Sequence, residues 1–175
     1  MLMIGRFADD KDQRTVIEAV KILKEEYHRT EKMLFVGAGD TLEYCKKLAK
    51  ELEIADQIIF EGARYDVQNY YSAAKLFVHS SPAEGLPTVL LEAMQYDVPI
   101  VATDSFPGVS EILKNEKYGM TCEVANPREM ARRMNEMLSD ETKMEHYKKM
   151  GRERLLDFSE DKIREELKQV IQTLK

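Results

Sequence analysis

The feature that most constrains the fold is the alternation of short apolar runs with longer amphipathic segments along most of the chain. The apolar runs have the length and side-chain content of buried strands, and the segments between them repeat apolar residues at helical spacing. Such alternation is typical of a parallel sheet with helices on both faces. We therefore expect an α/β fold, a doubly wound parallel sheet of Rossmann-like type. The expected strands are residues 2–4, 33–36, 58–60, 76–79, 100–102 and 120–124, with helices at 12–27, from Asp40 to about 52, 67–73, from Leu86 through Met94, and 109–113.

The composition changes after Pro127, where charged residues dominate three helical segments. Asp140 is a candidate N-cap of the middle helix, and Ser159 with Lys162 offers half of a capping box for the last one. We expect these helices to flank the sheet. The sequence predicts a single domain, 1–175, with a βα core over about 1–126 and C-terminal helices over 127–175, at 128–138, 141–156 and 159–174.

Composition describes a soluble globular protein, with 43% hydrophobic and 33% charged residues among 175. The net charge of −6 argues against a nucleic-acid partner, and no apolar run reaches the roughly 20 residues that span a bilayer. Cys45 and Cys122 have no metal-ligand or disulfide-framework spacing, so we expect free thiols in a reducing cytoplasm. The histidines are also scattered, so we expect no metal site.

The segment 80–94 combines a strand end, a turn and a helix start. The preceding apolar run ends at His79, Gly85 permits a tight turn, and Pro87 suits the first turn of a helix because no N–H is needed there. We expect the helix to begin near Leu86, with its free N–H groups at the carboxyl edge of the sheet. Parallel sheets place ligands at this edge, and a helix N-terminus binds a diphosphate well.

Two carboxylates, Glu84 and Glu92, lie eight positions apart across this turn. A nucleotide sugar has hydroxyl groups on both sides of its diphosphate, so one carboxylate can accept hydrogen bonds from the sugar and the other from the ribose. The spacing alone favours a loop charge and a solvated helix residue over a ligand site, because two carboxylates eight positions apart are common. His79 precedes Glu84 at the strand end and is either part of the same site or a loop histidine with its own hydrogen bonds.

Several segments in order resemble the carboxyl-terminal half of the retaining glycosyltransferases of family 4. Glu84-Gly85-Leu86-Pro87 carries the most distinctive part, and the resemblance runs nearly from end to end of the chain. The other matching segments are Ile4-Gly5-Arg6-Phe7 with Lys11, Phe35-Val36-Gly37-Ala38-Gly39, Ile58-Ile59-Phe60-Glu61-Gly62, Leu90-Leu91-Glu92-Ala93-Met94, Val98-Pro99-Ile100-Val101-Ala102-Thr103-Asp104 and Gly108-Val109-Ser110-Glu111-Ile112.

The resemblance implies the donor-binding half of a two-domain GT-B enzyme, with an amino-terminal acceptor-binding half outside this sequence. The implied reaction moves a hexose-type sugar from a UDP-sugar or GDP-sugar to an acceptor hydroxyl, with retention and without a metal or other cofactor. By itself this half is expected to bind donor without turnover. The implied roles are diphosphate contact for Arg6 and Lys11, sugar contact for Glu84, ribose contact for Glu92, and a donor-binding turn made by Gly85, Leu86, Pro87 and Thr88.

The resemblance further implies cell-envelope or exopolysaccharide synthesis, in the cytoplasm and at the inner face of the membrane. A basic cluster on the late helices is a candidate for peripheral membrane contact, although interspersed glutamates favour a mixed solvated face. The alternatives are a stand-alone nucleotide-sugar-binding or sensor domain, and half of an epimerase or phosphorylase. The basic cluster is Arg128, Arg132, Arg133, Lys143, Lys148 and Lys149.

Two positions depart from the family pattern. Phe106-Pro107-Gly108 stands where many relatives have two glycines, and proline lacks the N–H that a glycine would offer to the donor there. Asp97 replaces a glycine expected at a helix C-terminus, where aspartate tolerates left-handed geometry less readily than glycine.

Two further motifs have weaker interpretations. Gly37-Ala38-Gly39 resembles a dinucleotide fingerprint, but Leu42 occupies the position of its third glycine. Asp10-Lys11-Asp12 resembles an Asp-x-Asp metal motif, but it lies at an expected helix start, where acidic residues interact favourably with the helix dipole, so helix capping is the better explanation.

Overall fold

The computed structural model describes residues 1–173 and contains a six-stranded parallel sheet with strand order β3-β2-β1-β4-β5-β6. The expected α/β fold is confirmed, and each predicted strand is present. The last strand is shorter than predicted, because the N–H of Glu123 donates to the Glu129 carboxylate at 2.8 Å instead of extending the ladder. The strands are β1 (Leu2–Ile4), β2 (Met33–Val36), β3 (Ile58–Gly62), β4 (Phe77–His79), β5 (Ile100–Thr103) and β6 (Met120–Cys122).

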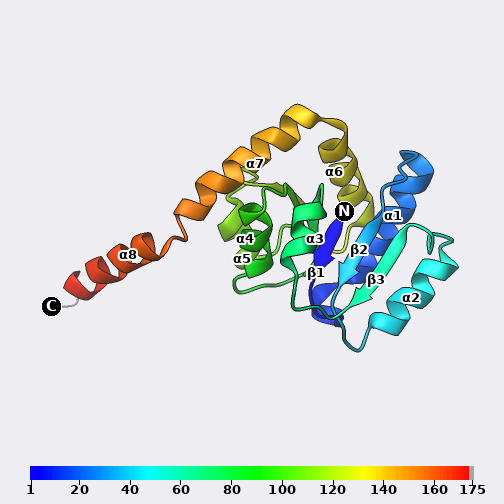
Figure 1. Ribbon diagram of the computed structural model, residues 1–175, viewed down its shortest axis with the longest axis horizontal. Helices are drawn as coiled ribbons and strands as arrows, with labels where there is room; N and C mark the ends of the chain where they lie inside the picture. Colours follow the sequence, from blue (N-terminus) through cyan, green and yellow to red (C-terminus); the bar gives the residue numbers. More distant parts are fainter. Residues whose placement is uncertain (174–175) are drawn as a thin grey trace.

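Helices cover both faces of the sheet (Figure 1). Strand residues alternate between two hydrophobic cores: Leu2 and Phe77 face one of them, and Met3 and Val78 face the other. The Met3 core includes residues of α1, α2 and α6, whereas the Leu2 core includes residues of α3, α4 and α5. These helices are α1 (Gln13–Glu26), α2 (Leu42–Glu51), α3 (Gln68–Ala73), α4 (Thr88–Gln95), α5 (Gly108–Leu113) and α6 (Pro127–Ser139).

Helix α4 begins two residues later than the sequence predicts. Pro87 has φ −75° and ψ 86° and is therefore the N-cap instead of the first helical residue. Its carbonyl accepts from the N–H of Leu90 at 3.0 Å, which is an early bond of the helix. Asp97, after the other end of α4, has a left-handed φ of 56°, as its position after a helix requires.

Two further helices, α7 (Glu141–Leu156) and α8 (Glu160–Thr173), follow α6. Asp140 caps α7, because its side chain accepts from the N–H of Lys143 at 2.9 Å, as predicted. Helix α7 packs on α4, where a Cβ added to Gly151 would lie 3.1 Å from Met94 Cγ. Helix α7 therefore supports the helix that carries Glu92.

Helix α8 extends beyond α7, away from the sheet (Figure 1), and contains no buried residue. Its start follows the predicted half capping box, since the N–H of Lys162 donates to the Ser159 hydroxyl at 3.4 Å. Residue 174, the predicted end of this helix, lies outside the described residues. The apolar side chains of α8 form an exposed stripe at helical spacing: Ile163, Leu167, Val170 and Ile171.

Basic residues of α6 and α7 are largely paired with glutamates. Five of the six predicted cluster members have such a partner, which leaves a surface of mixed charge. Within residues 1–173, no helix is long and apolar enough to cross a bilayer. The pairs are Arg128 with Glu26, Arg132 with Glu129, Arg133 with Glu116, Lys143 with Glu136, and Lys148 with Glu145.

We expect the backbone amides of Glu160–Thr173 to exchange with solvent much faster than those of α1. An isolated helix of this length is marginal in water, and α8 has no buried contacts to hold it. Hydrogen–deuterium exchange with peptide-level mass spectrometry measures this directly. Protection of α8 equal to that of α1 would contradict the prediction.

Arg154 joins α7 to the C-terminal end of α5. The side chain is only 3% exposed, and its Nε and Nη2 donate to the carbonyls of Ile112 at 3.0 Å and Glu111 at 2.8 Å. Nη1 pairs with Asp157 at 2.5 Å, and the guanidinium lies 4.6 Å from the centre of the Phe158 ring. These bonds satisfy carbonyls that the end of a short helix leaves without partners.

We expect Arg154→Ala to lower the free energy of unfolding by about 3 kcal/mol, because one buried carbonyl, one partly buried carbonyl and one carboxylate lose their donor. The matched control is Arg152→Ala on the same helix. Its side chain is 54% exposed and pairs with the exposed Asp97, so a change within about 0.5 kcal/mol is expected. Urea denaturation of both variants measures the difference, and equal effects would refute the anchoring role of Arg154.

Candidate functional site

The candidate site lies where β1 and β4 end. These strands are neighbours in the sheet, but the helices that follow them, α1 and α4, pack in different cores. The two loops therefore diverge and leave a depression, which is the switch point at which open parallel sheets bind ligands. A cavity of about 180 Å³ opens here, lined among others by Gly5, Lys11, His79, Glu84 and Thr88.

The chain between β1 and α1 is held in a defined conformation. After the 3₁₀ turn Asp9–Lys11, Asp12 adopts a left-handed φ of 47° and caps α1 by accepting from the Thr15 N–H at 3.3 Å and from its hydroxyl at 2.6 Å. The capping interpretation of the acidic motif is confirmed. In the part of the chain that the structure describes, no group of three or more His, Cys, Asp or Glu side chains could hold a metal ion.

Ser80 ties this segment to the loop after β4. Its side chain is fully buried, and the hydroxyl lies 2.9 Å from the carbonyl oxygen of Lys11 and 2.8 Å from that of Asp12. Ser80 is not among the site residues predicted from the sequence. The sequence does contain a signal for this contact: a serine directly after a buried strand is itself expected to be buried, and a buried hydroxyl needs a hydrogen-bond partner.

Lys11 and Glu84 meet across the switch point. Lys11 Nζ donates to Glu84 Oε1 at 2.5 Å, and the side chains are only 23% and 15% exposed. His79 Nε2 lies 3.5 Å from the same oxygen, the outer limit for a hydrogen bond. Neither ring nitrogen of His79 has a hydrogen-bond partner among residues 1–173, so this imidazole belongs to the site and is not a histidine satisfied elsewhere.

Glu84 is ionised at neutral pH. The nearby His79 and the Lys11 ammonium lower the pKa of its carboxyl to about 2, and they outweigh the partial burial that acts in the opposite direction. An ionised carboxylate only accepts hydrogen bonds. Glu84 can therefore orient a hydroxylated ligand, while Lys11 and the N–H groups at the start of α4 offer positive charge to an anion.

Glu92 occupies the second turn of α4, on the helix that begins at the cavity. Its Oε2 accepts from the Tyr71 hydroxyl at 2.9 Å, and its Oε1 lies 3.4 Å from the Thr88 hydroxyl. Burial, together with the Glu92 charge, raises the pKa of Tyr71, so the phenol remains a donor. Glu92 is thus a held, partly buried carboxylate instead of a freely solvated one.

Arg6 stands apart from the other predicted residues. Its side chain is 67% exposed and pairs with Asp10 at 3.3 Å, and no ion pair within residues 1–173 joins it to Glu84. The backbone here is fixed, because the buried Gln13 donates to the Arg6 carbonyl at 2.8 Å. The structure brings Lys11 and Glu84 together and leaves the Arg6 guanidinium at the rim.

Gly108 supports the Glu84 loop from the strand β5 side. Its N–H donates to the Glu84 carbonyl at 3.0 Å, and an added Cβ would lie 2.6 Å from that oxygen. Only glycine fits this approach. Pro107 has no N–H to donate, and Phe106 is 82% exposed. In the loop that differs from the family pattern, Gly108 is therefore the residue that supports the backbone of Glu84.

The glycines of Gly37-Ala38-Gly39 serve a similar packing purpose. A Cβ added to Gly37 would lie 1.9 Å from the carbonyl oxygen of Gly5, and a Cβ added to Gly39 would lie 2.2 Å from the carbonyl oxygen of Phe7. Both glycines have φ near +150°. They allow the loop after β2 to lie directly against the loop after β1, which accounts for the motif without a dinucleotide.

A doubly wound domain with a cation, a carboxylate and a helix N-terminus at its switch point belongs to the class of α/β ligand-binding domains that recognise anionic, hydroxylated molecules. Comparison with known families is more specific. The family described as glycosyl transferases group 1 matches residues 1–154, and the chain belongs to this family.

Individual relatives agree with this assignment. The chain is 31% identical over 174 residues to an uncharacterised glycosyltransferase of Haemophilus influenzae, covering 98% of this chain and 48% of that protein. It is 27% identical over 163 residues to the N-acetylgalactosamine-N,N'-diacetylbacillosaminyl-diphospho-undecaprenol 4-alpha-N-acetylgalactosaminyltransferase of Campylobacter jejuni, covering 93% and 44%. The chain spans about half the length of the curated relatives it matches.

Solved structures agree on the fold. The crystal structure of Anabaena Alr3699/HepE in complex with UDP superposes with a TM-score of 0.86 at 20% identity, covering 98% of this chain and 48% of that one. The α/β fold thus matches that of the C-terminal domains of GT-B glycosyltransferases.

The low pKa of Glu84 predicts how stability depends on pH. The folded value of about 2 lies below the ordinary 4.5, so the ionised carboxylate stabilises the fold above about pH 4.5, and this contribution disappears as the pH falls towards 2. We expect the free energy of unfolding of Glu84→Gln to fall less steeply than that of the wild type over this window. Urea denaturation at a series of pH values measures the slopes.

The matched control is Glu51→Gln on α2, where the side chain is 58% exposed and, among residues 1–173, pairs only with exposed Lys47. Its slope should equal that of the wild type. A wild-type slope in Glu84→Gln would mean that Glu84 is not held ionised in the fold.

Proposed function

We propose that this chain is the donor-binding part of a retaining glycosyltransferase that takes a hexose from a nucleoside-diphosphate sugar. The observation that carries the proposal is the ion pair of Lys11 and Glu84, which spans the switch point beside the N-terminus of α4. One arrangement thus supplies positive charge for a diphosphate and a fixed carboxylate for sugar hydroxyls. Membership of the glycosyl transferases group 1 supports it.

In the proposed complex, the diphosphate lies between Lys11 and the N–H groups that begin α4 at Thr88. The Gly85-Leu86-Pro87 turn delivers the chain to that helix end, and the exposed Arg6 reaches the phosphates from the rim by leaving Asp10. Positive charge placed here favours departure of the nucleoside diphosphate, because negative charge grows on it in the transition state. These groups provide the neutralisation that a metal ion supplies in other phosphate chemistry, so we propose transfer without a metal or other cofactor.

Glu84 and Glu92 then divide the hydroxyl groups of the donor between them. Glu84 accepts from the hexose and fixes the sugar ring relative to the leaving group. Glu92, held by Tyr71 and Thr88, accepts from the ribose. A positioning role for Glu84 suits its environment, since Lys11 and His79 stabilise its charge and thereby reduce its strength as a nucleophile.

The relatives suggest both the nucleotide base of the donor and the kind of acceptor. A UDP complex is known for the Anabaena protein, which favours a UDP-sugar over a GDP-sugar. The Campylobacter relative is described as acting on an undecaprenol-linked glycan, which suits cell-envelope or exopolysaccharide synthesis in the cytoplasm, at the inner face of the membrane. We propose that the acceptor binds to a second, amino-terminal half, on which the apolar stripe of α8 packs.

Calorimetric titration of the chain with UDP, GDP and ADP, followed by UDP-glucose, UDP-N-acetylglucosamine and GDP-mannose, tests the proposal. We expect selective binding of one nucleotide. Glu92→Ala should weaken it by about tenfold or more, because two hydrogen bonds to a charged group are lost. Glu84→Gln should retain the affinity for the free nucleoside diphosphate and lose the additional affinity that the sugar contributes.

Glu51→Ala on the exposed surface of α2 is the matched control and should bind like the wild type. Equal nucleotide affinity in Glu92→Ala and the wild type would remove the ribose role. Loss of nucleoside-diphosphate binding in Glu84→Gln, with the sugar contribution unchanged, would reverse the roles assigned to the two carboxylates.

A further inference from the structure

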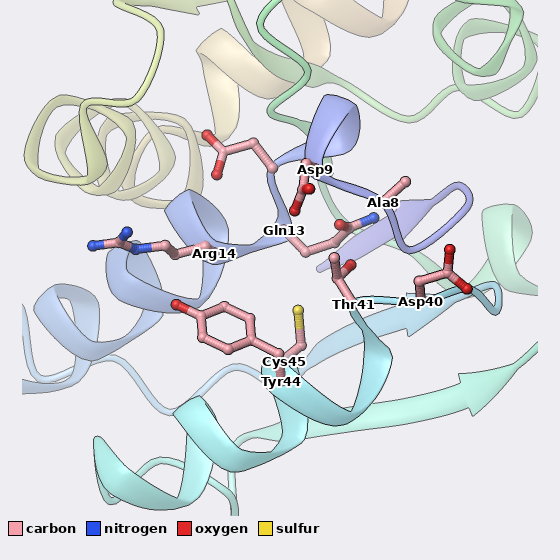
Figure 2. Close-up of a pocket in the computed structure, with 9 residues that line it drawn as sticks. Ala8, Asp9, Gln13, Arg14, Asp40, Thr41, Tyr44 and Cys45 are labelled. Atoms are coloured by element: carbon pink, nitrogen blue, oxygen red, sulfur yellow. The ribbon is translucent and has the colours of Figure 1, made fainter.

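A second cavity, of about 410 Å³, lies beside the donor site and is not used by the proposed reaction. The 3₁₀ turn Asp9–Lys11 separates the two: Lys11 lines the donor cavity, whereas Asp9 lines the larger one. Figure 2 shows Asp9 and Gln13 on the α1 side of this cavity and Tyr44 and Cys45 on the α2 side. Its volume falls in the usual range for small-molecule sites.

The walls of this cavity are acidic and partly without partners. The Asp9 and Asp40 carboxylates are exposed and form no ion pair within residues 1–173, and the nearest cation in the lining, Arg14, pairs with Glu18 at 2.7 Å. Because Asp12 adds a third carboxylate, the cavity disfavours phosphate. The carboxylates do not form a metal-binding group among the described residues, so their remaining capacity is to accept hydrogen bonds.

Two further groups point to the chemical class of the ligand. The Thr41 hydroxyl is buried at the cavity beside the Cys45 thiol and has no other hydrogen-bond partner in the described part of the chain. A thiol is a weak partner, so the hydroxyl is incompletely satisfied without a ligand. The Tyr44 side chain is 50% exposed and offers an apolar ring face. Burial raises the pKa of Cys45 to about 11, so its thiol is neutral and adds no charge.

An aromatic face flanked by carboxylates and an incompletely satisfied hydroxyl suits a neutral polyhydroxylated molecule, whose C–H face packs on the ring while its hydroxyls donate to the carboxylates. We propose that this cavity binds a neutral sugar residue, with Tyr44, Asp9, Asp40 and Thr41 as its contacts. Resting on the proposed function, we assign this sugar to a part of the acceptor glycan that extends from the amino-terminal half onto this chain. The single turn that carries both Asp9 and Lys11 would bring acceptor and donor together.

The test is a titration of the ¹⁵N-labelled chain with glucose, galactose, N-acetylglucosamine and N-acetylgalactosamine, followed by amide chemical shifts. We expect saturable shifts confined to residues 8–14 and 40–45 for at least one sugar. Tyr44→Ala and Asp40→Asn should each weaken this binding about tenfold, the equivalent of one lost good contact. Tyr44→Phe, which keeps the ring, should bind like the wild type.

UDP added to the same samples separates this inference from the proposed function. The Tyr44 variants should bind UDP normally, and Glu92→Ala should bind the sugar normally. If UDP binds and no sugar shifts residues 8–14 and 40–45, or if Tyr44→Ala leaves the shifts unchanged, the sugar site is refuted and the donor site stands. Sugar binding without any nucleotide binding would refute the donor site and its link to the acceptor instead.

Discussion

The pairing of β1 with β4 is the constraint on which the rest of the structure depends. β1 lies in the middle of the sheet, between β2 and β4, and alternate residues such as Leu2 and Met3 enter different cores. The β1–β2 and β4–β5 connections run in opposite directions along the sheet, so right-handed crossovers place α1 and α4 on opposite faces. The diverging loops bring Lys11 and Glu84, 73 positions apart in sequence, into direct contact at the switch point of the sheet.

Close backbone contacts and one buried hydroxyl keep that edge in place. Gly37 and Gly39 let the loop after β2 pack on the loop after β1, and Gly108 supports the carbonyl of Glu84. The Ser80 hydroxyl joins the loop after β4 to the segment before α1 through the carbonyls of Lys11 and Asp12. A rigid frame matters here because a charged pair of low exposure is stable only when its geometry is well defined.

Charge is sorted across the short turn Asp9–Lys11. On one side a lysine and a helix N-terminus surround a small cavity, and on the other side carboxylates line a larger one. An anionic ligand and a neutral hydroxylated ligand would thus be directed to different cavities by electrostatics alone.

The late helices have a different role. Helix α7 packs on α4 and is anchored by Arg154, while α8 remains exposed.

The amino-acid sequence by itself determined the doubly wound sheet, because apolar runs such as 33–36 and 100–102 have no other way to bury both faces. It also indicated Glu84 and the helix N-terminus after it, since glycine and proline constrain the local backbone. Only the tertiary structure decided that His79 and Lys11 face Glu84, that Arg6 does not, and that Tyr71 orients Glu92. Local pattern cannot predict such contacts, because they join residues far apart in the chain whose separation depends on how helices pack on the two faces of the sheet.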